Sequence, residues 1–189
     1  ELVLFSANYS PFNWMNSPLN QHNNINQTED IPYNEIYLPS NKNLIRYQLA
    51  MVKKIVKEVN GFNNVYFEIC NEPYWLKGIP EVDTSIHKQQ VTPAMYKWQD
   101  NIALEIKQTE QRLPKKHLVA QNFANTYMKV DSIGNAVSIL NFHYAYPPKT
   151  VTDNYSLNRP VSFDETDDGL NAPEKRKEAW AFMMAGGAV

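Results

Sequence analysis

The chain has 189 residues, of which 43% are hydrophobic and 20% are charged, and its formal net charge is −2. This composition is typical of a globular domain with one sizeable core. The near-neutral charge, without a basic tract, argues against nucleic acid as the main partner. No apolar run approaches the roughly 18 residues that a membrane span requires. The only cysteine, Cys70, forms no internal disulfide, and the four histidines lack metal-ligand spacing, so we expect no cofactor.

Strands and helices alternate along the first half of the chain. Residues 2–7 form a continuous apolar run that predicts a strand, and a long polar loop follows from about Asn8 to Asn43. The stretch "LIRYQLAMVKKIVKEV" has apolar residues at helical spacing, which predicts an amphipathic helix that ends near Gly61. Residues 65–70 predict a second strand. Thr92-Pro93 then begins another helix, as an N-cap followed by proline at the first helical position.

The second half continues the same alternation. Strands are predicted over residues 117–123, 137–144 and 160–165, and a last helix over 172–185, with Asn171 and Glu174 spaced as in a capping box. The final "GGAV" is compatible with the start of another strand. Apolar strands alternating with helices predict an α/β fold with a parallel sheet. A flavodoxin-like open sheet and a closed (β/α)8 TIM barrel both fit this pattern.

Polar residues gather where the predicted strands end. In either fold these ends meet at one edge of the sheet, which is where functional residues collect. Two glutamates at that edge supply the paired carboxyl groups that cleavage of a glycosidic bond needs, one as proton donor and one as nucleophile or base. In chain order the strand-end residues are Asn71, Glu72, Asn122, His143, Tyr144, Asp164 and Glu165.

Three of these strand ends carry a resemblance to a known family. The motif "FEICNEP" resembles the fourth-strand motif of clan A glycoside hydrolases, especially the cellulase-type family 5 enzymes. "FHYAYPP" is similar to the sixth strand of that clan and "PVSFDET" to the seventh. The resemblance implies a (β/α)8 barrel and retaining hydrolysis of O-glycosidic bonds, with a β linkage, in a poly- or oligosaccharide.

The same resemblance implies roles for individual residues. Glu72 would be the general acid/base, which requires a protonated carboxyl group with a raised pKa, and Glu165 would be the nucleophile. Asn71 would hold the 2-hydroxyl of the sugar, and His143 would line the site. Two points stay open: strand alternation allows only one of Asp164 and Glu165 to face the pocket, and either Tyr144 or Tyr146 could bind the nucleophile.

Further candidates have a structural interpretation beside the functional one. Trp14 and Trp75 lie in strand-to-helix loops, where sugar rings could stack on them, but each could equally pack against its own loop. Asn122 could equally contact substrate in the pocket or be part of the structural scaffold. Glu68, inside its strand, is interpreted as a buried structural group, and Cys70 as a core residue.

The resemblance also bears on completeness and location. It assigns residues 1–189 to strands three to eight of a single barrel domain. Because such a barrel takes about 250 residues, we expect an incomplete one here, with the first two strands missing and the eighth truncated. Most members of the family are exported, which implies a secreted, periplasmic or cell-surface protein. The glycan, the linkage and the oligomeric state are not indicated.

Two other classes of function compete with a glycosidase. One is a carbohydrate-binding barrel that has lost catalysis, which would bind sugar without turnover. The other is an open-sheet α/β hydrolase or nucleotide binder, and it is disfavoured because the chain has no G-x-S-x-G, G-x-G-x-x-G or P-loop motif.

Overall fold

The computed structural model describes residues 1–74 and 90–189, and its centre is a parallel β-sheet. Each pair of neighbouring strands is parallel, and the spatial order β1-β2-β3-β4-β5 follows the order along the chain. The strands are β1 (Leu2–Ser6), β2 (Phe67–Asn71), β3 (Val119–Asn125), β4 (Ile139–His143) and β5 (Val161–Glu165). All five predicted strands are therefore present, with boundaries shifted by one or two residues.

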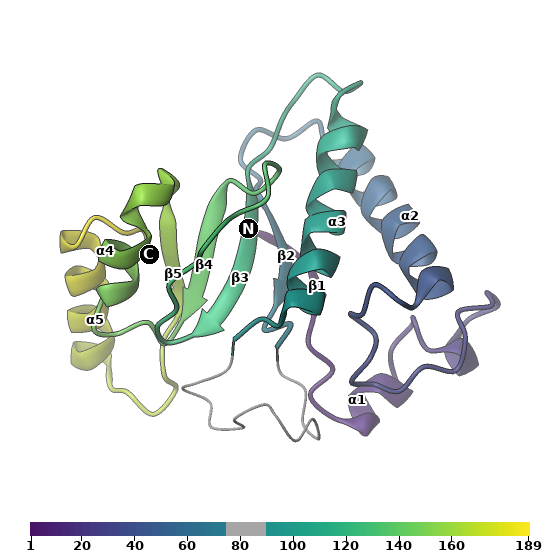
Figure 1. The fold of residues 1–189 in the computed structure, drawn as a ribbon, viewed down its shortest axis with the longest axis horizontal. Helices are drawn as coiled ribbons and strands as arrows, with labels where there is room; N and C mark the ends of the chain where they lie inside the picture. The colour runs from purple at the N-terminus through teal and green to yellow at the C-terminus, as the bar shows by residue number, and fades with distance from the viewer. Residues whose placement is uncertain (75–89) are drawn as a thin grey trace.

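The strand order separates the two folds that the sequence left open. A flavodoxin-like sheet has the order 2-1-3-4-5, in which the winding reverses once. The sheet described here has no reversal, and all its arrowheads point toward the same edge, where the loop after β1 and helix α1 also lie (Figure 1). This is an α/β fold whose successive strands add to one side of the sheet, an arrangement compatible with part of an α/β barrel.

Helices pack beside the sheet in two groups. α2 and α3 lie together next to β1 and β2, whereas α4 and α5 lie at the opposite end beside β5 (Figure 1). None of the helices within residues 1–74 and 90–189 combines the length and apolar character of a membrane span. The helices are α1 (Pro11–Met15), α2 (Lys42–Val59), α3 (Pro93–Glu110), α4 (Lys149–Asn154) and α5 (Ala172–Met184), with short 3-10 turns η1 (Gln21–Asn23) and η3 (Tyr155–Leu157).

Local signals account for where these helices begin. Thr92 caps α3 by accepting from the backbone N–H of Met95, and Asn171 forms a complete capping box with Glu174 at the start of α5, both as predicted. The helix α1 was not predicted, because the loop from Asn8 to Asn43 has no apolar periodicity. Its signal is local: Ser10 caps the helix and proline follows at its first position.

The segment "GGAV" at residues 186–189 pairs with β5, as expected for the start of another strand. The backbone N–H of Ala188 donates to Val161 and its carbonyl accepts from Phe163, which forms a parallel bridge alongside β5. The chain therefore begins to add to the edge of the sheet at β5.

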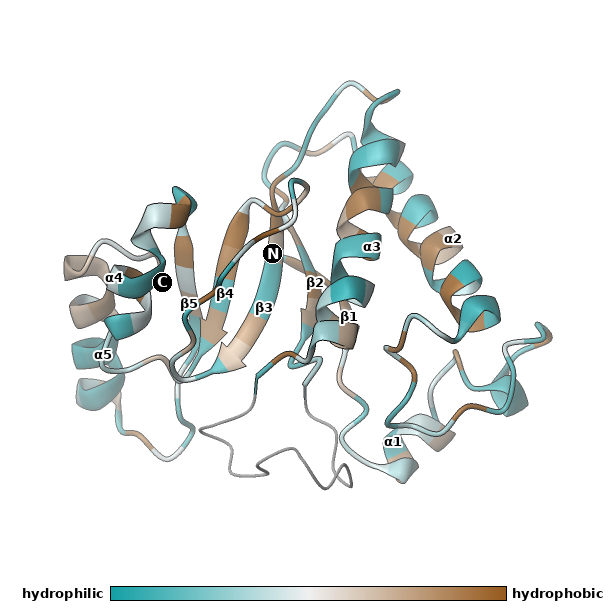
Figure 2. Cartoon of the chain, in the orientation of Figure 1, coloured by the Kyte–Doolittle hydropathy of each residue, from teal (hydrophilic) through white to brown (hydrophobic). Residues whose placement is uncertain are grey.

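Apolar side chains of the strands and helices form two core clusters. The hydrophobic stretches of β4, α2 and α3 are brown in Figure 2. In the first, the ring of Trp98 on α3 packs against Phe5 and Tyr37, with centroids 5.3 and 4.3 Å apart. In the second, Phe163 of β5 packs on Phe182 of α5 at 5.1 Å. Burial of these large side chains fixes the strands against the helices.

The opposite face of the sheet is buried but polar. On β4, Leu140 and Phe142 belong to the helix-facing core, whereas Asn141 and His143 alternate with them and are at most 1% exposed. Glu68 on β2 is 1% exposed and accepts a hydrogen bond from Asn141, in agreement with the prediction that it is a buried structural group. The strands are thus buried on both faces, but only one face is apolar.

A buried ion pair joins the end of α3 to the start of β3. The ring of His117 contacts Glu110 Oε1 through Nδ1 at 2.5 Å and the carbonyl of Phe62 through Nε2 at 2.9 Å. Burial lowers the pKa of His117, but these two contacts outweigh it, so the net pKa lies above its ordinary value.

We expect this pair to make stability depend on pH. Because the folded pKa of His117 is raised, its contribution is fully present below the unfolded-state pKa of about 6.5. It is lost as pH rises through the folded pKa. Urea unfolding at several pH values should therefore show His117→Gln less stable by about 2 kcal/mol at low pH and by less at high pH. The exposed His22→Gln variant serves as control, and a deficit that does not change with pH would contradict the assignment.

Candidate active site

The backbone turns sharply just after β2 and β4 and presents two side chains there. Glu72 has a φ of 47° and Tyr144 a φ of 49°, both in the left-handed region. Non-glycine residues adopt this region rarely and at a cost of about 1–3 kcal/mol. Such strain persists only where surrounding contacts hold it, and it is concentrated at functional sites.

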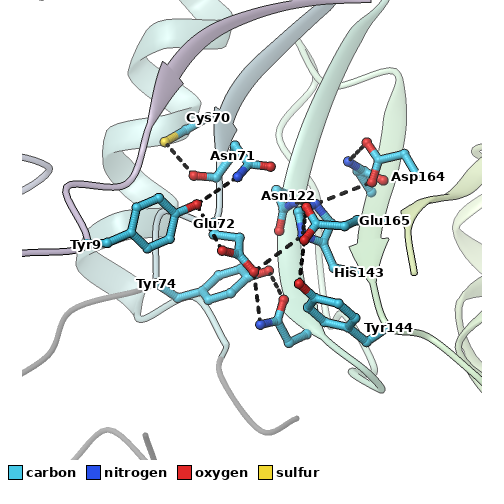
Figure 3. A network of polar contacts seen from close by, with 12 residues as sticks. Tyr9, Cys70, Asn71, Glu72, Tyr74, Asn122, His143, Tyr144, Asp164 and Glu165 are labelled. Atoms are coloured by element: carbon cyan, nitrogen blue, oxygen red, sulfur yellow. Dashed lines mark hydrogen bonds and ion pairs between the residues drawn. The ribbon is translucent and has the colours of Figure 1, made fainter. Parts of the chain in front are cut away.

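Glu72 lies at the centre of a network of hydrogen bonds and is 5% exposed (Figure 3). Tyr9 donates to its Oε2 at 3.0 Å, and Asn125 donates to its Oε1 at 3.1 Å. The Nδ1 atom of His143 lies 3.5 Å from the same Oε1. The carboxylate therefore has partners from the loop after β1 and from the ends of β3 and β4.

The ring of His143 lies between the two predicted catalytic glutamates and is fully buried. Its Nδ1 is 3.5 Å from Glu72 and 3.3 Å from Glu165 Oε2. One oxygen of each glutamate and a ring nitrogen of His143 lie within 4.8 Å of one another. The structure therefore brings together the carboxylates at the tips of β2 and β5, with an imidazole N–H as their common neighbour (Figure 3).

Both Asp164 and Glu165 face this site, so the prediction that only one of them could do so is wrong. Asp164 Oδ1 is 3.3 Å from His143 Nε2, while Glu165 contacts Nδ1 of the same ring. The cause is a shift in register: Phe142 pairs with Phe163, but His143 pairs with Glu165. One extra residue on β5 breaks the strict alternation of side chains and turns two consecutive carboxylates to one side.

Tyr144 is the tyrosine that contacts Glu165. Its hydroxyl donates to Glu165 Oε1, and burial together with that carboxylate raises the pKa of Tyr144. Tyr146 instead is 39% exposed, with Lys177 6.0 Å from its ring centre. Both tyrosines border a cavity of about 360 Å³ together with Thr126, Asp167, Leu170 and Glu178.

The expected raised pKa of Glu72 is wrong for this structure. Burial raises the pKa, but the contacts with His143, Asn125 and Tyr9 favour the ionised carboxylate, and the net pKa lies below its ordinary value. Burial lowers the pKa of His143 in turn, and the carboxylates around it outweigh that effect and raise the pKa. Of Glu72 and His143, the imidazole of His143 is therefore the group that carries a proton.

The remaining candidates divide between this site and the scaffold. Asn71 donates to the Tyr9 hydroxyl at 2.9 Å, which places it beside Glu72. Asn122 is fully buried, with Nδ2 2.5 Å from His143 Nε2, so it contacts the imidazole from β3. Trp14 is 7% exposed within the first core cluster, so its predicted stacking face is covered by its own loop. Trp75 lies outside the described residues.

Sequence reasoning missed three residues that contact this network: Tyr9, Tyr74 and Asn125. Tyr74 donates to Asn125 Oδ1 at 2.6 Å, and Asn125 in turn donates to Glu72. A signal existed for two of them. Tyr9 follows the first strand closely, and Asn125 ends β3, which extends two residues beyond its predicted end. No sequence signal identifies Tyr74, because only the folded chain brings it into contact with Asn125.

Two groups of side chains have donor sets that could hold a metal ion. They are Glu72 with His143 and Glu165, and Glu68 with His143 and Asp164. The two sets share one histidine. Hydrogen bonds from Tyr9, Asn125, Asn141 and Tyr144 already occupy carboxylate oxygens in both sets.

Comparison of the chain with protein-family models, with curated proteins and with solved structures finds no match. A function for this chain therefore has to be inferred from the geometry of the site and from the sequence motifs at the strand ends.

We expect removal of the imidazole to reverse the ionisation of Glu72. The variant His143→Gln removes the cationic neighbour and should raise the pKa of Glu72 by about 1–2 units. A pH titration of glutamate side-chain carboxyl signals by 13C NMR measures this, with Glu72→Gln for assignment. Tyr9→Phe is the comparison, and it should give a smaller rise because a neutral donor is lost. An unchanged pKa in His143→Gln would show that the imidazole does not hold Glu72 ionised.

Proposed function

We propose that this chain carries the active site of a retaining glycoside hydrolase that cleaves β-linked O-glycosidic bonds in a poly- or oligosaccharide. The observation that carries the proposal is the approach of the Glu72 and Glu165 carboxylate oxygens to within 4.8 Å. Retaining enzymes hold their two carboxyl groups about 5–5.5 Å apart, whereas inverting enzymes leave about 6.5–9.5 Å for a water molecule. The short separation favours the retaining mechanism.

The proposal includes the fold. The five strands correspond to strands three to seven of a (β/α)8 barrel, and the bridge at Ala188 corresponds to the start of the eighth. Support comes from the strand order without reversal and from the site at the carboxyl ends of the strands, where barrel enzymes have their active sites. It also comes from the resemblance of "FEICNEP" to the fourth strand of clan A glycoside hydrolases.

The first chemical step forms a bond between Glu165 and the sugar. A carboxylate oxygen of Glu165 attacks the anomeric carbon while the bond to the leaving oxygen breaks, and Glu72 delivers a proton to that oxygen. In the second step Glu72 removes a proton from water, which attacks the same carbon and releases Glu165. Tyr144 and His143 bind Glu165 and hold its orientation, and Asn71 lies where it could contact the 2-hydroxyl group.

The proton for the first step comes from His143 in this scheme. Without substrate, the imidazole holds the proton and Glu72 is ionised. Substrate excludes water from the site, which disfavours the charged carboxylate and raises the pKa of Glu72. Nδ1 lies 3.5 Å from Glu72 Oε1, and its proton moves to that oxygen, from which it passes to the leaving group.

A second candidate is a barrel that binds carbohydrate without cleaving it. One observation favours it: the pKa of Glu72 below its ordinary value makes the free protein a poor proton donor at neutral pH. Calorimetric titration with oligosaccharides distinguishes the two functions, because this candidate requires binding without turnover. Export of the protein to the cell surface or beyond is proposed on the family resemblance alone.

We expect the two glutamates to respond differently to substitution. Glu165→Ala removes the nucleophile and should lower kcat/KM by at least about 10⁴-fold on every substrate. Glu72→Ala should lose about 10²–10⁴-fold on glycosides with poor leaving groups but much less on dinitrophenyl glycosides, which need little protonation. Release of aryl alcohols from β-glucosides, β-mannosides and β-xylosides measures this.

The neighbouring, exposed Asp168→Asn variant is the matched control for these assays. It removes one negative charge without a hydrogen bond to either glutamate, and it should keep the unsubstituted activity. Equal losses in Glu72→Ala for good and poor leaving groups would exclude Glu72 as the acid.

The stereochemistry of the product tests the mechanism separately. Proton NMR during the first minutes of hydrolysis of a β-glycoside should show the β anomer first, because two inversions give net retention. Early appearance of the α anomer would assign an inverting mechanism instead.

A further inference from the structure

A second pair of carboxyl groups lies behind the candidate active site. Glu68 of β2 and Asp164 of β5 come from strands that are not neighbours, and Asn141 of β4 lies between them. The Nδ2 group of Asn141 donates to Glu68 Oε2 at 2.8 Å and to Asp164 Oδ2 at 2.6 Å. One oxygen of each carboxyl group lies within 4.8 Å of the other and of the His143 ring.

The carboxyl groups in and behind the candidate site outnumber the basic groups near them. Glu72, Asp164 and Glu165 all contact His143, and Glu68 lies beside Asp164. Within residues 1–74 and 90–189, His143 is the only basic group within 4.0 Å of these four carboxyl groups. Four negative charges around one positive charge, with Glu68 and Glu72 buried, are strongly unfavourable and favour retention of a proton on at least one carboxyl group.

Glu68 is the member of the pair that best retains a proton. It is 1% exposed, its Oε1 has no hydrogen-bond partner, and it contacts no basic group. Acidic groups beside it include Glu1, Tyr66 and Asp164, and the His143 ring lies within 4.8 Å of one of its oxygens but is not paired with it. Burial, the contact with Glu1 and the charge of Asp164 raise the pKa of Glu68 far above its ordinary value. Burial also raises the pKa of Asp164 above its ordinary value, but the charge of His143 and the hydrogen bond from Asn141 oppose that effect and favour its ionised form.

The surroundings of His143 fit a doubly protonated ring. Its Nδ1 faces Glu72 and Glu165, and its Nε2 faces Asp164 Oδ1 at 3.3 Å. Asn122 places Nδ2 2.5 Å from Nε2, while its own Oδ1 is buried without a partner. Rotation of this amide by half a turn gives Oδ1 a donor if Nε2 carries a hydrogen. Acceptor oxygens then lie within 3.5 Å of both ring nitrogens, as an imidazolium requires, and Nδ1 approaches its two carboxylates without a formed hydrogen bond.

We propose that Glu68 and Asp164 share one proton, carried on Glu68, and that the charged Asp164 is a positioning residue that keeps His143 doubly protonated between Glu72 and Glu165. The charge arrangement stands on the contacts and burial of these five residues, and its role in supplying a proton rests on the proposed function. Asp164 acts through the imidazole and needs no contact with substrate.

The ionisation of His143 itself is the first readout. NMR titration of the imidazole carbon signals, with the His143 signal assigned by its loss in His143→Gln, should give a pKa above 6.5. In Asp164→Asn the pKa should fall by at least about 1 unit, because an opposite charge next to the ring is lost. In Glu68→Gln it should change by only a few tenths, because the amide reproduces a neutral donor. Asp168→Asn controls for net charge and should leave the pKa unchanged.

Two outcomes of this titration overturn the proposal. An unchanged His143 pKa in Asp164→Asn, or an equal fall in Glu68→Gln, would mean that Glu68 and Asp164 do not divide charge in this way. If Asp164→Asn does not fold, the infrared spectrum of the unsubstituted protein decides. It should show the carbonyl stretch of a protonated carboxylic acid at neutral pH, and the folded Glu68→Gln protein should lack it. Retention of that band in Glu68→Gln overturns the proposal.

Activity assays separate this proposal from the proposed function. In Asp164→Asn the basic limb of the kcat/KM profile should move to lower pH by the same amount as the His143 pKa. The limb should stay in place in Glu68→Gln. A shifted His143 pKa without glycosidase activity in any form would reject the function and keep the charge arrangement. Activity with an unmoved pKa and limb would reject the charge arrangement and keep the function.

Discussion

One buried imidazole sets the conditions for the rest of the site. The ring of His143 is fully buried and lies within 3.5 Å of carboxylates from β2 and β5. In a poorly solvated interior these charges interact strongly, and each must be held in place by something other than water. The strands, their register and the turns that follow them keep these charged side chains in place. Features of the backbone that look irregular in isolation are consistent with this requirement.

Two such irregularities can be traced to the imidazole. The left-handed backbone at Glu72 and Tyr144 turns both side chains back toward the ends of the strands. The register shift on β5 turns Asp164 and Glu165 to the same side, so that one contacts each nitrogen of the ring. The strain of these conformations is offset by the two apolar clusters on the other face of the sheet, which fix the strands against the helices.

The polar face of the sheet has two layers with different tasks. Near the strand ends lie Glu72 and Glu165, whose side chains are 6% and 40% exposed. Beneath them, Glu68, Asn141 and Asp164 are linked by short hydrogen bonds from a single amide group. In the charge arrangement that we propose, the charge of this lower layer acts on the upper layer through His143. In that arrangement the protonation of His143, between Glu72 and Glu165, depends on Asp164 at its other nitrogen.

The sequence by itself determined the alternation of strands and helices, because hydrophobic periodicity and capping residues act over a few neighbouring positions. It also placed Glu72, His143 and Glu165 at strand ends, since parallel strands bring their carboxyl ends to one edge. Only the tertiary structure decided that Tyr144 binds Glu165, that both Asp164 and Glu165 face the ring, and that His143, Asn125 and Tyr9 lower the pKa of Glu72. The pKa of Glu72 was predicted with the wrong sign for the same reason. Burial can be anticipated from the strand, but the donors that outweigh it come from the loop after β1 and from β3 and β4, and their approach depends on register and packing.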